Sequence, residues 1–212
     1  MDIDQTGSFY VAIETYRRKS IGTLIRCAAA FGAKAIIVVG SLKYSTHGAH
    51  GAQKHLPIIH FFYWSECKKY AYENGYAVVG ISSSHFYPDI QNLSTYQIPN
   101  SVIFVVGSRG PLLTLEQRDI CDVIVEVTFP ISDRLAQKIN YDVIVSLCFN
   151  HFALKCKFSQ ISLQGEKYTI QNSQVKSLQT PSSAASVEEV KFTPVEYDDC
   201  LSPMHTLFED IT

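Results

Sequence analysis

The sequence predicts an α/β domain, a mainly parallel β-sheet with helices on both faces. Short runs that are apolar throughout recur along residues 9–158, as expected of strands that are buried on both faces of a sheet. Segments with helical periodicity separate these runs, and parallel strands require such crossovers. Residues typical of helix ends, such as Ser20, Gly32 and Thr114, stand at the boundaries of the helical segments.

The first half of the domain alternates strands and helices. One helix is expected from Ser20 to Phe31, where Gly32 stops it, and a second from Ser65 to Glu73. The segment 41–56 is rich in Gly, His and Ser and is expected to be a loop. The expected strands of this half cover residues 9–13, 35–39, 58–63 and 76–81.

The second half ends in a long helix, expected from about Leu135 to Phe158. Its apolar positions include Ile139, Val143, Leu147 and Leu154. Ligands of parallel sheets bind beyond the carboxyl ends of strands, so the loops that begin at Gly40, Gly107 and Phe129-Pro130 are where chemistry is expected. The other segments of this half are an irregular stretch at 82–100, strands at 102–106 and 123–127, and a short helix at 114–120.

The net charge of −2 conceals an asymmetry along the 212 residues. Residues 1–158 contain 15 Lys and Arg against 12 Asp and Glu, whereas residues 159–212 contain 3 against 8. The mildly basic domain, residues 1–158, permits an anionic partner but does not demand one. The acidic tail, residues 159–212, also contains a stretch rich in Ser, Gln, Thr and Pro, and is expected to be disordered or to dock a protein partner.

Several classes of protein lose support. No run reaches the roughly 18 to 20 apolar residues that a membrane-spanning helix needs, and Met1–Gln5 fits neither a secretory signal nor a transit peptide. The cysteines form no C-x-x-C pair and are expected to be reduced thiols of a cytoplasmic protein, with the nucleus as the alternative compartment. They are Cys27, Cys67, Cys121, Cys148, Cys156 and Cys200.

Common enzyme signatures are missing from the sequence. It contains no G-x-x-x-x-G-K-[ST] phosphate loop, no G-x-G-x-x-G after the first strand and no G-x-S-x-G elbow. His47, His50, His55 and His60 do not have the spacing or acidic partners of a zinc site, so they are expected to be structural or to face RNA, and no metal is expected.

Short segments at the strand ends are more informative when taken in order. Residues 20–26 read SIGTLIR and are followed by CAAAFGA; residues 47–52 read HGAHGA and precede Leu56-Pro57. Residues 105–110 read VVGSRG at the end of a buried strand. Cys121-Asp122, Phe129-Pro130 and Ile139-Asn140 follow.

This order and placement resemble the motifs of the SpoU (TrmH) family of RNA ribose methyltransferases. In that family the first motif is N-x-G-x-x-x-R followed by F-G-A, the second is G-N-E-G, and the third combines C-D, I-P and S-L-N. The resemblance covers roughly residues 9–156. It implies a SPOUT-type α/β domain with a C-terminal trefoil knot, a rare exception to the usual rules of chain connection.

The resemblance also implies a cofactor and a site. S-adenosylmethionine would sit in the knot, held mainly by backbone groups, and the family works as a homodimer with this pocket at the subunit interface. The catalytic candidates are Arg26, which would fix the RNA phosphate and polarise the ribose 2′-hydroxyl, and Asn140. The positions implied for the cofactor are Val106, Gly107, Gly110, Phe129, Pro130 and Ile139, and those expected to contact RNA are Arg17, Arg18, Lys19 and Arg109.

The sequence departs from the family pattern at several polar positions. Ser20 replaces the Asn of the first motif, Ser108 and Arg109 replace Asn and Glu of the second, and Lys138 replaces the Ser of the third. Two functions follow from this. One is an S-adenosylmethionine-dependent RNA 2′-O-ribose methyltransferase acting on tRNA or rRNA; the other is a catalytically inactive RNA-binding or ribonucleoprotein assembly factor. A third, a docking module that acts through its acidic tail, stays open.

Overall fold

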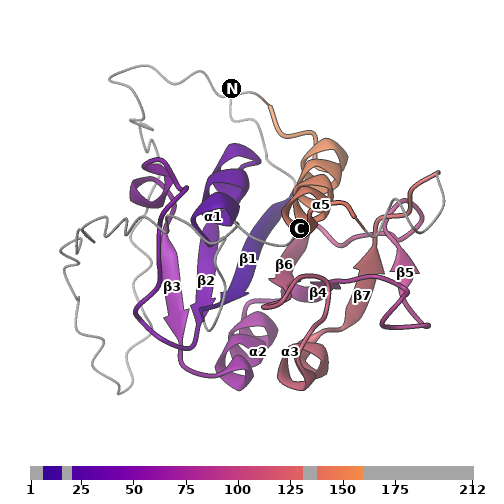
Figure 1. Cartoon of the computed structure of the whole chain (residues 1–212), viewed down its shortest axis with the longest axis horizontal. Coiled ribbons are helices and arrows are strands. Elements are labelled where there is room, and N and C mark those ends of the chain that lie inside the picture. Colours follow the sequence, from indigo (N-terminus) through magenta and orange to yellow (C-terminus); the bar gives the residue numbers. More distant parts are fainter. Residues whose placement is uncertain (1–6, 16–20, 131–137, 160–212) are drawn as a thin grey trace, which may run out of the picture. The chain divides into compact units, whose positions relative to one another are not determined.

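The computed structural model describes residues 7–15, 21–130 and 138–159. Within these residues the strands form one seven-stranded sheet in the order β3-β2-β1-β6-β4-β7-β5, and every pairing is parallel (Figure 1). The predicted fold class is therefore confirmed. The strands are β1 (Ser8–Glu14), β2 (Ala35–Val39), β3 (Ile58–Phe61), β4 (Ala77–Ile81), β5 (Gln91–Asn92), β6 (Ser101–Val106) and β7 (Val123–Glu126).

Helices cover both faces of the sheet, α1 and α5 on one and α2 and α3 on the other (Figure 1). Alternate residues of β1 serve the two faces, as the period of a strand requires. Phe9 packs under α1 and α5, whereas Tyr10 packs with α2 and α3. The helices are α1 (Ile21–Ala30), α2 (Trp64–Glu73), α3 (Leu115–Ile120) and α5 (Tyr141–Lys155).

A cluster of phenylalanines fixes α5 on the centre of the sheet. The ring of Phe9 on β1 lies 5.3 Å from that of Phe149 and 5.4 Å from that of Phe152, measured between centroids. Phe104 on β6 lies 5.7 Å from Phe149. All four side chains are fully buried, so one ring on α5 contacts both central strands.

The long helix differs from its prediction in two ways. It begins at Tyr141 and not near Leu135, and of its expected apolar positions Val143, Leu147 and Leu154 are exposed. The helix has apolar residues on all of its own sides, so the periodicity of the sequence alone does not identify the buried face. The phenylalanine cluster chooses it, and the buried residues are Tyr141, Val145, Cys148, Phe149 and Phe152.

Most other elements lie within two residues of their expected bounds. The exceptions are β5, inside the segment expected to be irregular, and the short 3-10 helix η1 (Ala52–Lys54), inside the expected loop. Residues 131–137 and the tail from residue 160 lie outside the described residues, and the trefoil knot stays a prediction. Among the described residues no helix is long and apolar enough to cross a membrane.

Candidate functional site

A hydrogen-bond network joins the carboxyl ends of β1 and β6. Glu14 ends β1, and its carboxylate accepts a hydrogen bond from the hydroxyl of Ser108, two residues beyond β6. Ser108 Oγ also accepts from Gln117 Nε2 at 3.2 Å. Gln117 is fully buried on α3 and donates a second bond, of 3.3 Å, to the carbonyl of Val106. The loop after β6 is therefore held between the end of β1 and the first turn of α3.

Tyr141, the first residue of α5, connects this edge to a third strand. Its buried hydroxyl donates to the carbonyl of Ile81, the last residue of β4, at 2.7 Å, and accepts from the amide of Gly107 at 3.2 Å. The hydroxyl of Ser82 donates to the carbonyl of Pro111 and links the loops after β4 and β6 again. Because β4 and β6 are neighbours in the sheet, both loops meet the start of α5 at one place.

Gly107 and Gly110 shape this loop for different reasons. A Cβ on Gly107 would collide with the carbonyl oxygens of Gly110 and Leu112, the latter at 2.8 Å. The loop's own backbone therefore fills the space on that side of Gly107. Gly110 has a φ of +83°, which glycine adopts readily, and no heavy atom of the described residues is found within 4 Å of the position of its Cβ. Among these residues, none fills the space beside Gly110.

The first turn of α1 packs through glycine against the loop after β2. A Cβ on Gly22 would overlap the carbonyl oxygen of His47. Across the same contact, a Cβ on Gly48 would lie 3.1 Å from the hydroxyl of Thr23. The two segments that the sequence singled out for their small residues are therefore adjacent in the structure.

Comparison with known proteins identifies the family. A model of the SpoU rRNA Methylase family matches residues 9–136, which is more than half of the chain and all of the sheet except Ser8. The chain belongs to the SpoU family. A search of curated protein sequences finds no match.

Solved structures share the fold at low sequence identity. The SpoU methyltransferase AviRb from Streptomyces viridochromogenes, in complex with AdoMet, is 18% identical with a TM-score of 0.60, over 75% of this chain and 63% of that one. The AdoMet-bound rRNA methyltransferase from Sinorhizobium meliloti is 20% identical with a TM-score of 0.56, over 70% and 57%. The TrmH/SpoU tRNA modifying enzyme of A. aeolicus is 13% identical with a TM-score of 0.58, over 72% and 76%. The chain thus spans about 60% of the length of the first two.

The residues at the polar positions of the SpoU motifs are spread over the site. Arg26 on α1 and Arg109 in the loop after β6 are both exposed. The sequence predicted Asn140 inside a helix, and this prediction is wrong. Asn140 is the N-cap of α5, where its Oδ1 accepts a hydrogen bond from the amide of Asp142 at 2.9 Å. In the described part of the chain, no hydrogen bond or ion pair links Arg26, Arg109 and Asn140 to one another.

The positions implied for the SpoU cofactor lie near three neighbouring strands. Val106 ends β6 and Gly107 follows it, and Phe129-Pro130 begins three residues after β7, which pairs with β4. Ile139 immediately precedes the N-cap of α5. Arg17, Arg18 and Lys19, expected to contact RNA, lie outside the described residues.

Three residues of the network were not found from the sequence. For Glu14 the sequence does contain a signal of a functional role, because its carboxylate ends an otherwise apolar strand at the ligand-binding edge of the sheet. Gln117 had a weaker one, because it forms a capping box with Thr114, whose Oγ1 accepts from the Gln117 amide at 3.2 Å. Tyr141 had none, because an aromatic residue in an apolar helix is usually a core residue.

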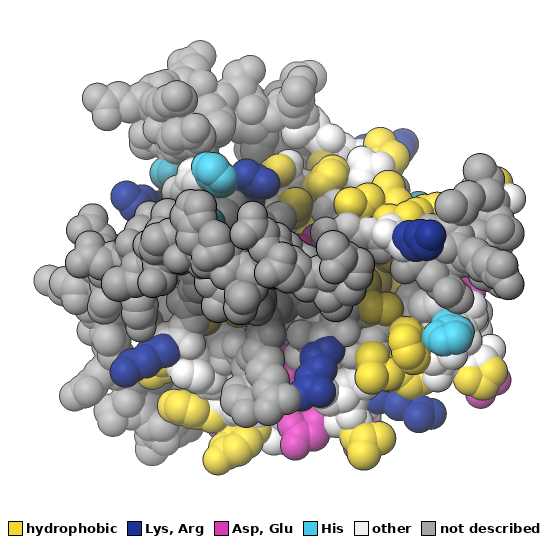
Figure 2. Space-filling view, in the orientation of Figure 1, with side chains coloured by type: hydrophobic (Ala, Val, Ile, Leu, Met, Phe, Trp, Pro, Cys, Tyr) yellow, Lys and Arg dark blue, Asp and Glu magenta, His cyan; other side chains and the backbone are white. Residues whose placement is uncertain are grey.

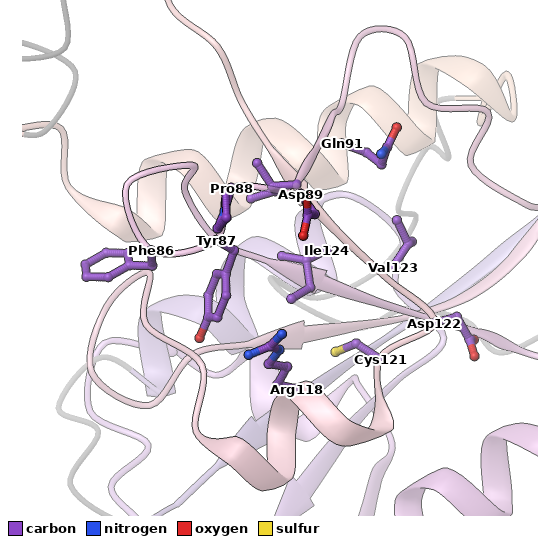
Figure 3. Close-up of a pocket in the computed structure, with 11 residues that line it drawn as sticks. Phe86, Tyr87, Pro88, Asp89, Gln91, Arg118, Cys121, Asp122, Val123 and Ile124 are labelled. Carbon is purple, nitrogen blue, oxygen red and sulfur yellow. The ribbon is translucent and has the colours of Figure 1, made fainter.

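A separate cavity of about 480 Å³ lies between residues 86–91, the end of α3 and the start of β7 (Figure 3). Figure 3 shows Arg118 extending from α3 toward Tyr87, and its guanidinium carbon lies 5.5 Å from the centre of that ring. Tyr87 in turn donates to the carbonyl of Leu113 at 2.9 Å. Because none of the residues implied for the SpoU cofactor lines this cavity, it is distinct from the site at the carboxyl edge.

Three cysteine thiols and His60 lie where they support the fold. Burial raises the pKa of the Cys67, Cys121 and Cys148 thiols to about 12, so they remain protonated and are poor nucleophiles near neutral pH. His60 Nε2 lies 2.8 Å from the carbonyl oxygen of Gly40 and holds the ends of β2 and β3 together. Among the described residues no group of three His, Cys, Asp or Glu side chains is placed to hold a metal ion.

Proposed function

We propose that this chain is an S-adenosylmethionine-dependent RNA 2′-O-ribose methyltransferase that acts on tRNA or rRNA. Membership of the SpoU family supports methyl transfer to RNA. The single observation on which the proposal depends is the convergence of the loops after β6 and β4 with the start of α5, through Tyr141 and Ser108. Two of the solved structures with this fold hold AdoMet, which supports the same cofactor here.

The loop after β6 fits a ligand that is recognised through backbone groups. No described residue fills the space beside Gly110, and the loop is held by the hydrogen bonds of Ser108 and Gln117. Gly110, Phe129, Pro130 and Ile139 would hold the cofactor, with Val106 and Gly107 fixing the loop. When bound, S-adenosylmethionine supplies an electrophilic methyl group on its sulfonium sulfur.

Arg26 is the group we assign to the RNA. The residue is exposed, and a guanidinium donates hydrogen bonds but has no acceptor, so it suits binding a phosphate and not accepting a proton. It would hold the phosphate next to the target ribose and polarise the 2′-hydroxyl, whose proton passes to a phosphate oxygen or water. Asn140 uses its Oδ1 to cap α5, which leaves the Nδ2 group to donate to the substrate. Most of the catalysis would come from placing the hydroxyl oxygen in line with the methyl group.

We further propose that the protein works as a homodimer. The outer face of α5 exposes Val143, Leu147 and Leu154, and Leu154 is 69% exposed. A cavity of about 240 Å³ lies beside this face, between α5 and the segments that follow β5 and β7. A contiguous apolar surface of this kind is typical of a protein interface. We also propose a cytoplasmic location, with the nucleus as the alternative, and a protein partner for the acidic tail.

A second function, an inactive RNA-binding or assembly factor, is favoured by one observation. At the second motif the hydroxyl of Ser108 is bonded to Glu14, and the amide of Gly107 is bonded to Tyr141. These polar groups therefore already have partners within the protein. The exposed Arg109 adds positive charge where the family has an acidic residue.

Calorimetric titration of the full chain with S-adenosylhomocysteine separates the two functions. Binding in the micromolar range, followed by transfer of a radiolabelled methyl group to tRNA or rRNA, is the expected result. Micromolar binding without transfer to either RNA would favour the inactive factor. If millimolar ligand does not bind, the cofactor proposal is wrong. Light scattering on the same sample should give twice the chain mass, and a monomer would contradict the dimer.

A further inference from the structure

One stretch of the sequence has a continuous excess of positive charge. Residues 15–65 contain seven Lys and Arg and no Asp or Glu, since Glu14 and Glu66 bound the span. Arg17, Arg18 and Lys19 lie outside the described residues, and Lys34 lies at the amino end of β2. The Lys, Arg and His side chains that Figure 2 shows over the loop with η1 also lie at the amino edge of the sheet, because η1 leads into the start of β3. Lys43 is exposed and follows the carboxyl end of β2 by four residues. A positive charge at this edge attracts the phosphates of a nucleic acid.

Two exposed aromatic residues lie at the end of β3, within the same span. Phe62 is 61% exposed and Tyr63 is 68% exposed. Single exposed apolar side chains are common and need no explanation, but these two belong to an ordered segment. Their backbone amides both donate to one carboxylate oxygen of Glu66, at 2.8 and 3.1 Å. The His60 ring packs edge-on against Phe62, with centroids 4.7 Å apart. The structure therefore holds the aromatic pair Phe62–Tyr63 in place while leaving both rings accessible.

The aromatic pair lies on the same edge of the sheet as the candidate site. His60 is bonded to Gly40 at the end of β2, and the amide of Ser41 donates to Thr15 Oγ1 at 2.8 Å. Thr15 follows Glu14, the residue that holds Ser108. β3, β2 and β1 are consecutive neighbours in the sheet (Figure 1). Two strand spacings put the end of β3 about 10 Å from the end of β1. The exposed side chain of Lys43 lies in the loop between them.

We propose that Phe62 and Tyr63 stack on unpaired bases of the RNA that flank the nucleotide in the candidate site. This inference rests on the proposed RNA methyltransferase function and adds a substrate class, a single-stranded or loop segment of RNA. Aromatic side chains beside basic residues are the usual stacking partners of unpaired bases. In a duplex the faces of the bases are hidden and cannot be stacked on in this way. Stacking tolerates any base, so the pair sets where the strand lies and leaves the choice of sequence to other contacts.

The test measures binding of the full chain to a fluorescein-labelled 12-nucleotide RNA that cannot pair with itself, by fluorescence anisotropy. Phe62→Ala and Tyr63→Ala should each weaken binding roughly tenfold, while Phe62→Trp should retain it and Phe62→Leu should not. The matched control is Tyr72→Ala, which removes an aromatic ring that is 87% exposed at the far end of α2 and should leave binding unchanged. Blunt duplex RNA should compete poorly with the labelled strand.

The outcomes distinguish a failure of the stacking role from a failure of the proposed RNA methyltransferase function. If the parent binds the RNA and the Phe62 and Tyr63 variants bind it equally well, the stacking role is wrong and the pair faces some other partner. If the parent binds no RNA, both this inference and the RNA-directed function are wrong. Titration with S-adenosylhomocysteine reports on the cofactor alone and should give the same affinity for every variant. Circular dichroism checks that each variant is folded.

Discussion

The two halves of the sheet present different side chains near the carboxyl ends of their strands. Around β6 and β4, Ser108 and Tyr141 bond to Glu14 and to Ile81, so these side chains are held within the protein. Around β1 to β3, Arg26, Phe62 and Tyr63 are exposed. This difference underlies the division of labour that we propose, in which one half would shape the cofactor pocket through its backbone and the other would offer side chains to RNA.

The largest expected effect comes from Phe149 on α5, whose ring contacts both halves of the sheet. Phe149→Ala should lower the free energy of unfolding by about 3–5 kcal/mol, because the ring packs on Phe9 of β1 and on Phe104 of β6. Urea denaturation measures the change. Leu154→Ala, on the exposed face of the same helix, is the control and should cost less than about 1 kcal/mol. Equal losses in the two variants would mean that the phenylalanine cluster does not hold the halves together.

The next prediction separates the two halves by function. Arg26→Ala should reduce methyl transfer by roughly 100-fold or more, because it removes the charge that positions the phosphate and stabilises the transition state. The affinity for S-adenosylhomocysteine, which depends on the other half, should stay within about twofold. Lys34→Ala is the control, since Lys34 is also an exposed cation but lies beyond the opposite end of α1. A variant that methylates as well as the parent would remove Arg26 from the site.

The smallest expected effect concerns the Tyr141 hydroxyl, which supports the loop after β6. Tyr141→Phe removes the hydroxyl that bridges Gly107 and Ile81, and should lower the free energy of unfolding by about 1–3 kcal/mol. S-adenosylhomocysteine should bind less tightly, because the loop after β6 loses a support. Tyr63→Phe removes an exposed hydroxyl and should change neither quantity. Tighter binding by Tyr141→Phe would instead show that the hydroxyl competes with the cofactor for the amide of Gly107.

Much of the fold was predictable because its strands are buried on both faces. Runs such as residues 35–39 and 102–106 are apolar throughout, and few other structures tolerate such runs in a folded domain of this size. β5 was missed because Gln91 and Asn92 have no pattern and form a strand only by pairing with β7. Asn140 was placed inside a helix because the start of α5 depends on a cap, which a continuous apolar pattern does not mark.

The candidate site was predictable only in part, for a related reason. Arg26 and the glycines of the loop after β6 stand in short segments that are legible in sequence. Glu14 and Ser108 are 94 residues apart, and Tyr141 and Ile81 are 60 apart. No local pattern reports such pairs, since they exist only when the sheet brings distant strand ends to one edge.

The sequence by itself determined the α/β class, nearly all the strands and the family motifs, because burial on two faces and close backbone contacts restrict which residues are allowed. The tertiary structure alone decided which face of α5 is buried, which glycine borders open space, and that Phe62 and Tyr63 share an edge with Glu14 and Ser108. Those outcomes depend on packing between elements far apart in the chain, where side chains with the same local preference have different neighbours.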